Sequence, residues 1–220
     1  MPVPHLAVID PAVRMAELDC FNHISLRTTA KVSYHLPALF GMETLVALED
    51  SITAFLILGS SSSVNDRLPW QSKLETWLKP QLEQRKPTLG LCYGHQMLAY
   101  MWGGKIDFLF KDHHKLQGFR RIRFQKDELW NHSELEGLVY VSHKEAVTEC
   151  PKTMQVLATS EEVKFDGLKH KTLPIWSLQS HPESTSLFLK NMGEPNCVSL
   201  QAFDFGRQIV DHFLTHVQRS

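Results

Sequence analysis

The chain has 220 residues, of which 43% are hydrophobic and 21% charged, a composition that argues against disordered, collagen-like and coiled-coil proteins. This length suffices for one large core, so we expect a single domain over 1–220. The 23 basic and 24 acidic side chains leave a formal net charge of -1, which supplies no global field for holding a nucleic acid.

Two further features of composition concern location and cysteine chemistry. The apolar runs are far shorter than the roughly 18 to 20 residues that span a bilayer, and the start lacks the pattern of a secretory signal. We therefore expect a cytoplasmic protein without membrane contact. The four cysteines, at 20, 92, 150 and 197, form no C-x-x-C pair, which favours free thiols over disulfides or a zinc module.

The first half of the chain alternates predicted strands and helices. Short apolar runs predict buried strands at 5–10, 31–36 and 53–58. Apolar residues at helical spacing then predict a helix over 70–85, followed by a strand over 87–92 and a helix over 95–102 that ends at Gly103-Gly104. Such alternation is typical of a parallel sheet covered by helices.

The second half has a different pattern. Further short strands are predicted at 121–124, 138–142, 155–159 and 175–179. A terminal helix from about Asp204 carries one apolar face and is expected to pack back on the sheet. The predicted fold class is therefore α/β, with a mostly parallel central sheet flanked by helices and a smaller mixed or antiparallel region.

The segment Gly90-Leu91-Cys92-Tyr93-Gly94 has the G-x-C-x-G pattern of a nucleophile elbow with sulfur in place of oxygen. It lies where a predicted strand turns into a helix. Glycines are needed on both sides because neighbouring backbone lies close to the strained elbow residue. The turn exposes Cys92 Sγ at a helix N-terminus, where the helix dipole favours the reactive thiolate.

A thiol nucleophile needs a base, and the base needs a group that orients it. His181-Pro182-Glu183 follows a predicted strand, and residues two apart in extended chain point to the same side. Glu183 is thus placed to fix the tautomer of His181. Alone this tripeptide is a weak signal, and its value comes from its combination with the elbow.

A third segment, Gly59-Ser60, follows the strand predicted at 53–58, and parallel sheets bind ligands at the carboxyl ends of their strands. Its backbone N–H groups, together with that of Tyr93, could bind an oxyanion. Without the other two motifs, a plain polar loop would be the better interpretation.

With these motifs in their order along the chain, the sequence resembles the class I glutamine amidotransferases, and most closely free-standing glutaminase domains similar to that of GMP synthase. The resemblance implies a flavodoxin-like fold, with Cys92 as nucleophile, His181 as general acid and base, and Glu183 as its orienting group. It also implies that Gln96 helps to hold the substrate glutamine. Relatives often carry proline at the position of Ser61, so the loop is expected to be more flexible here.

The expected reaction is hydrolysis of the glutamine side-chain amide through a γ-glutamyl thioester on Cys92, with no metal or organic cofactor. The sequence carries no G-x-x-x-x-G-K-[ST] motif for binding a nucleotide, so a separate synthetase is expected to accept the ammonia. Two alternatives stay open. The same triad could cleave γ-glutamyl peptides or conjugates, or the chain could be a regulatory binding module without activity.

Three weaker signals lead to no site. The basic stretch over 111–126 is interpreted as a solvated face, with a partner surface as the next alternative. His212 and His216 have a spacing that can hold zinc, but no third ligand is evident. Ser142-His143 matches a segment near the family's glutamine pocket, so His143 is either a wall of that pocket or a solvated histidine.

Overall fold

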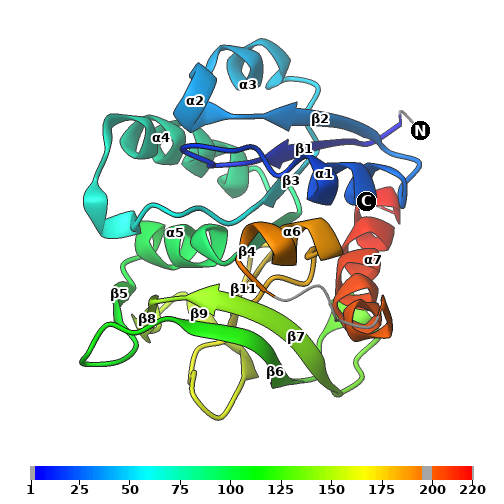
Figure 1. Ribbon diagram of the computed structural model, residues 1–220. Helices are drawn as coiled ribbons and strands as arrows, with labels where there is room; N and C mark the ends of the chain where they lie inside the picture. The colour runs from blue at the N-terminus through cyan, green and yellow to red at the C-terminus, as the bar shows by residue number, and fades with distance from the viewer. Residues whose placement is uncertain (1–2, 195–199, 220) are drawn as a thin grey trace.

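The computed structural model describes residues 3–194 and 200–219. Within them, nine strands form one sheet in the order β2-β1-β3-β4-β11-β10-β9-β6-β7 (Figure 1). The first five strands in this order are mutually parallel and the other four are antiparallel to their neighbours. The parallel strands are β1 (His5–Ile9), β2 (Lys31–His35), β3 (Ala54–Ile57), β4 (Thr88–Leu91) and β11 (Ile175–Leu178).

The order of these five strands is that of a flavodoxin-like sheet, whose ligands bind beyond the carboxyl ends of the strands near the β1/β3 switch point. The predicted fold class is confirmed. The antiparallel half consists of β6 (Leu116–Phe124), β7 (Leu135–His143), β9 (Met154–Thr159) and β10 (Gly167–His170), while β5 (Lys105–Phe108) and β8 (Glu145–Glu149) form a separate two-stranded sheet.

Helices cover both faces of the parallel strands because alternate strand residues point to opposite sides. On one face, Leu6, Val8 and Leu56 pack with residues of α1 (Leu18–Ser25) and α7 (Asp204–Arg219). On the other face, Ala7 and Ile9 pack with α3 (Glu43–Leu48), α4 (Pro69–Glu83) and α5 (Tyr93–Met101). The sheet is therefore buried on both sides, as parallel sheets require.

The terminal helix α7 packs as predicted. Its residues Ile209, Phe213 and Val217 are buried against the face of the sheet that holds Leu6 and Val8 (Figure 1). Two short helices, α2 (Pro37–Phe40) and α6 (Ser186–Asn191), complete the set of α-helices in the described part of the chain, together with short 3-10 turns at Val64–Asp66, Glu128–Trp130 and Leu200–Phe203.

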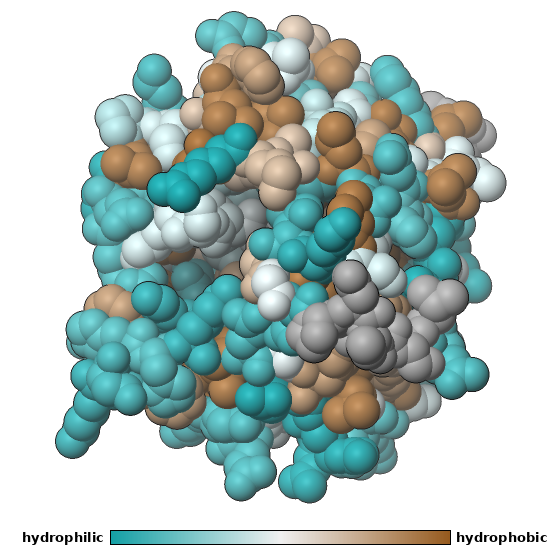
Figure 2. Space-filling view, viewed as in Figure 1, coloured by the Kyte–Doolittle hydropathy of each residue, from teal (hydrophilic) through white to brown (hydrophobic). Residues whose placement is uncertain are grey.

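The structure contains elements that the sequence did not predict, namely α1, α2, α3, β5, β8 and β10. The surface near α2 and α3 is apolar, with brown side chains at the top of the view in Figure 2. Phe40 is 77% exposed and Val46 is 51% exposed there. Among the described residues, no helix has both the length and the apolar character needed to cross a bilayer.

Candidate active site

The elbow forms where β4 meets α5. Cys92 is the residue before the helix, with φ of 49° and ψ of -100°, a backbone conformation that is strained for a residue with a side chain. A Cβ at Gly90 would lie 2.7 Å from the backbone of Gly94, and a Cβ at Gly94 would lie 2.6 Å from the carbonyl oxygen of Ile57. Both glycines therefore permit the close backbone contacts that the turn requires.

His181 and Glu183 follow β11, which is the parallel neighbour of β4. The Nδ1 atom of His181 lies 2.8 Å from Glu183 Oε1, and both side chains are buried. Burial by itself lowers the pKa of His181, but the adjacent Cys92 and Glu183 outweigh it and raise the pKa to about 10. The imidazole is therefore protonated at neutral pH when a thiolate stands beside it.

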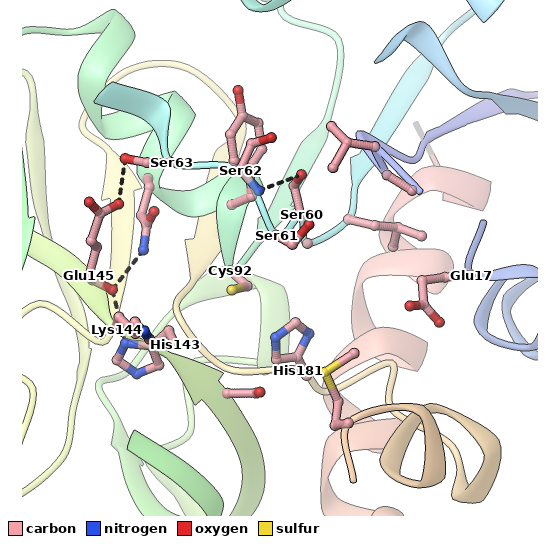
Figure 3. A pocket seen from close by; sticks show the side chains of 18 of the residues that line it. Glu17, Ser60, Ser61, Ser62, Ser63, Cys92, His143, Lys144, Glu145 and His181 are labelled. Carbon is pink, nitrogen blue, oxygen red and sulfur yellow. Dashed lines mark hydrogen bonds between the residues drawn. The ribbon is translucent and has the colours of Figure 1, made fainter. Parts of the chain in front are cut away.

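Gly59 brings the nucleophile and the imidazole together. A Cβ at this position would lie 2.8 Å from His181 Cε1 and 3.5 Å from Cys92 Cβ. The loop after β3 thus passes directly over both side chains, and Figure 3 shows Cys92 and His181 in the same cavity. Eighty-eight residues separate them in the sequence, and the pairing of β4 with β11 closes that distance.

The three amides predicted to bind an oxyanion belong to residues that line this cavity, namely Gly59, Ser60 and Tyr93. Across the described residues, none of these N–H groups donates a hydrogen bond to another protein atom. Free donors beside the sulfur are what an anionic intermediate needs.

Hydrogen bonds hold the serine loop in place of the proline found in relatives. Ser60 Oγ donates to the carbonyl oxygen of Pro11 at 2.7 Å and accepts from the N–H of Ser62. Ser63 Oγ donates to Glu145 Oε2 at 2.6 Å, a contact drawn in Figure 3. The loop is thereby tied to the β1–α1 connection on one side and to β8 on the other.

Gln96, the predicted substrate-binding residue, also lines the cavity. Its Nε2 donates to the carbonyl oxygen of Glu145 at 2.8 Å and to Gln179 Oε1 at 3.0 Å. Because both N–H bonds are used within the protein, only its Oε1 atom is left to accept a hydrogen bond from a ligand.

The cavity has a volume of about 640 Å³ and extends well beyond the sulfur. On the far side of His181 lies Glu17, from the β1–α1 connection, which the sequence analysis did not identify (Figure 3). Asp10 holds that connection by accepting from the N–H groups of Ala12 and Glu17. Burial, followed by the nearby Asp10 and Glu183 carboxylates, raises the pKa of Glu17 to about 7.

The structure also places the residues that the sequence left undecided. His143 is 5% exposed and lines the cavity, so it is a wall of the pocket and not a solvated histidine. Its Nδ1 lies 2.9 Å from the carbonyl oxygen of Glu145, and burial lowers its pKa to about 4. In the basic stretch, Arg121 and Arg123 pair with Glu136 in solvent, whereas Lys115 lines the cavity.

The remaining cysteines lie elsewhere. Cys20 is fully buried, and burial raises its pKa well above the ordinary value, as expected of a packing residue. Cys150 is half-buried, and Cys197 lies outside the described residues. Within the described ranges, no group of three or more His, Cys, Asp or Glu side chains is placed to hold a metal ion.

Comparison with solved structures agrees with this architecture. A glutamine amidotransferase from Thermotoga maritima matches with a TM-score of 0.77 over the full length of both chains, at 16% identity. A glutamine amidotransferase from Methylobacillus flagellatus matches with a TM-score of 0.73, at 17% identity, over 99% of this chain and 95% of that one. At such low identity these matches show a shared fold.

Sequence relatives include one of the subunits of glutamine-hydrolysing GMP synthase. The protein from Pyrococcus abyssi is 36% identical over 97 residues, 44% of this chain and 50% of that protein. The one from Archaeoglobus fulgidus is 26% identical over 166 residues, 74% of this chain and 83% of that protein. In the first relatives, the matching region spans about half of their length.

The model of the family described as "Glutamine amidotransferase class-I" matches residues 26–191, which contain the elbow and the His-Pro-Glu segment. The predicted family and enzyme class are thereby confirmed. This chain belongs to the class I glutamine amidotransferases.

Proposed function

We propose that the protein hydrolyses the side-chain amide of glutamine, with Cys92 as nucleophile, His181 as general acid and base, and Glu183 as the group that orients His181. The observation that carries the proposal is the single cavity in which Cys92, at a strained elbow, meets a buried imidazole hydrogen-bonded to Glu183. Family membership supports the same chemistry.

In the first half of the reaction, the Cys92 thiolate attacks the amide carbon, and a C–S bond forms as the carbonyl oxygen takes up the negative charge. The N–H groups of Gly59, Ser60 and Tyr93 bind this oxyanion. The thiolate charge that raised the pKa of His181 is consumed by the attack. The imidazolium then gives its proton to the amide nitrogen, and ammonia leaves.

In the second half, the neutral His181 removes a proton from water, which attacks the γ-glutamyl thioester. The C–S bond breaks, glutamate is released, and the sulfur returns as thiolate beside the protonated imidazole. Burial favours the neutral imidazole once the thiolate is gone, so the same group serves as acid and then as base. The Gln96 Oε1 atom is the part of that side chain available to the substrate.

Relatives named as one component of GMP synthase support a second protein as the destination of the ammonia. We propose an ammonia-accepting synthetase as this partner. The cytoplasm is the proposed location, because both glutamine and such synthetases are found there.

The size of the cavity favours one alternative substrate class. Pockets of roughly 300–1,000 Å³ hold drug-sized ligands, and about 640 Å³ is generous for free glutamine. The space on the Glu17 side of His181 could take the leaving group of a γ-glutamyl peptide, which the same triad would cleave.

The test is glutamate release by the purified chain from glutamine and, in parallel, from a γ-glutamyl dipeptide, with Cys92→Ser as the control. Release from glutamine that Cys92→Ser lacks supports the proposal. Release from the dipeptide alone makes the chain a γ-glutamyl hydrolase. No release from either, with and without a synthetase added, would sink the catalytic proposal and leave a binding module.

A further inference from the structure

Gln179 is a side chain in contact with the Cys92 sulfur that the mechanism above does not use. It follows β11 directly, and the parallel register that pairs Leu178 with Leu91 makes it the neighbour of Cys92. The Cys92 N–H donates to the carbonyl oxygen of Leu178 at 2.8 Å, which ties the two strand ends together. The Gln179 side chain is completely buried, and its Nε2 lies 3.7 Å from Cys92 Sγ.

The direction in which the Gln179 amide points follows from its neighbours. A backbone carbonyl can only accept a hydrogen bond, so the Glu145 carbonyl requires the Nε2 of Gln96 beside it. The second N–H of that group points to Gln179, which must therefore present its oxygen to Gln96. The Gln179 Nε2 is consequently left on the side of the sulfur, as a donor.

We propose that Gln179 is a further catalytic residue of the glutaminase reaction, which donates a hydrogen bond to the Cys92 thiolate and is held in that orientation by Gln96. The inference rests on the proposed function. A neutral donor stabilises a thiolate more than a thiol, because the charged sulfur is the stronger acceptor. Unlike His181, Gln179 carries no proton to transfer, so its donor stays in place throughout the cycle.

The chain of contacts also links the nucleophile to the oxyanion loop. Glu145 accepts from Gln96 through its carbonyl oxygen and from Ser63 through its carboxylate. One residue of β8 thus positions the donor to the sulfur and the loop that carries the oxyanion amides. In this account Gln96 is a positioning residue as well as part of the cavity wall.

The test measures alkylation of Cys92 by iodoacetamide as a function of pH, with the Cys92 peptide quantified by mass spectrometry, in Gln179→Leu and Gln179→Glu. Both variants keep the approximate size of the side chain. The pH midpoint of alkylation should rise by about one unit in Gln179→Leu, a tenfold loss of thiolate below the midpoint. It should rise further in Gln179→Glu, because a carboxylate beside the sulfur repels its charge.

The matched control is Gln81→Leu, which removes another nearly buried amide, on α4, where it accepts from Lys86. It should melt at a lower temperature with an unchanged alkylation midpoint, which is the behaviour of a merely structural glutamine. Should Gln179→Leu fail to fold, Gln96→Leu provides the same measurement from α5, with a smaller rise expected because the Gln179 amide is then free to rotate.

Two outcomes separate this inference from the proposed function. Wild-type midpoints in the folded Gln179 variants, or in Gln96→Leu if those do not fold, would overturn the inference while glutamine hydrolysis by the wild-type chain stood. Shifted midpoints in a wild-type chain that hydrolyses no glutamine would support donation to the sulfur and overturn the function. Shifted midpoints with an approximately tenfold lower kcat/KM for glutamine would support both.

Discussion

A single methyl group at Gly59 should disable the site, because this glycine passes directly over the reacting side chains. An added Cβ would lie 2.8 Å from His181 Cε1, whereas carbon atoms make contact at about 3.5 Å or more. The imidazole or the loop must then move by about 0.7 Å. The backbone at Gly59 does not have a positive φ, so Gly59→Ala adds a steric change without requiring a conformation that alanine avoids.

Two effects set the expected size. A misplacement of about 1 Å can cost around 10²-fold in rate, and the loss of one oxyanion donor costs about 10²- to 10³-fold. We therefore expect kcat for glutamine to fall by about 10²-fold or more. Overpacking should lower stability by about 1–3 kcal/mol, which corresponds to roughly 2 to 12 °C in Tm for a domain of this size.

The assay is glutamate release per folded molecule, with Tm measured on the same sample. The matched control is Gly104→Ala, whose Cβ would lie 2.9 Å from the carbonyl oxygens of Ala99 and Glu149, far from the sulfur. It should lose stability and keep its kcat. If Gly59→Ala turned over at the wild-type rate, the close packing of this loop on His181 would have no part in catalysis.

Three further predictions concern buried groups. Glu183→Gln should lower the pKa of His181 and reduce kcat by about 10²-fold; since the pKa of His181 is raised on folding, its contribution to stability is present below about pH 6.5 and lost as pH rises through about 10, so urea unfolding of the two proteins should differ most at the lower pH. His35, whose pKa burial and then His5 lower to about 4, should cost stability as pH falls from 6.5 to 4, and His35→Gln should flatten this loss in urea unfolding. Asp127→Ala should destabilise by about 3 kcal/mol, seen as a lower urea midpoint, because it leaves Trp176 Nε1 and Lys169 Nζ without their buried acceptor; equal midpoints would contradict this.

The strands and helices beside the elbow were predictable because their signals are local. The run over 87–92 and the glycines around Cys92 specify a strand and a sharp turn, and β4 forms at Thr88–Leu91. The helix begins at Tyr93, two residues earlier than predicted, because Cys92 itself is the residue before its first turn. Likewise α4 runs through Pro80 and ends three residues later, as expected where a proline removes a hydrogen-bond donor.

The rest depended on contacts distant in sequence. No side chain caps α1, and α3 is only six residues long, so neither carries a clear start signal; both are stabilised by packing against the sheet. The same holds within the site. Glu17 lies outside any motif and reaches the cavity because Asp10 holds its loop. Gln179 could have been found as the residue that aligns with Cys92 once β4 and β11 were paired, but the pairing itself has no local signal.

The most direct measurement is mass spectrometry of the intact chain quenched in acid during turnover of glutamine. The account predicts one added γ-glutamyl group, located on the Cys92 peptide, that builds up in His181→Gln and is absent from Cys92→Ala. Glutamate release by Cys92→Ala, or a glutamyl group on a different residue, would contradict it.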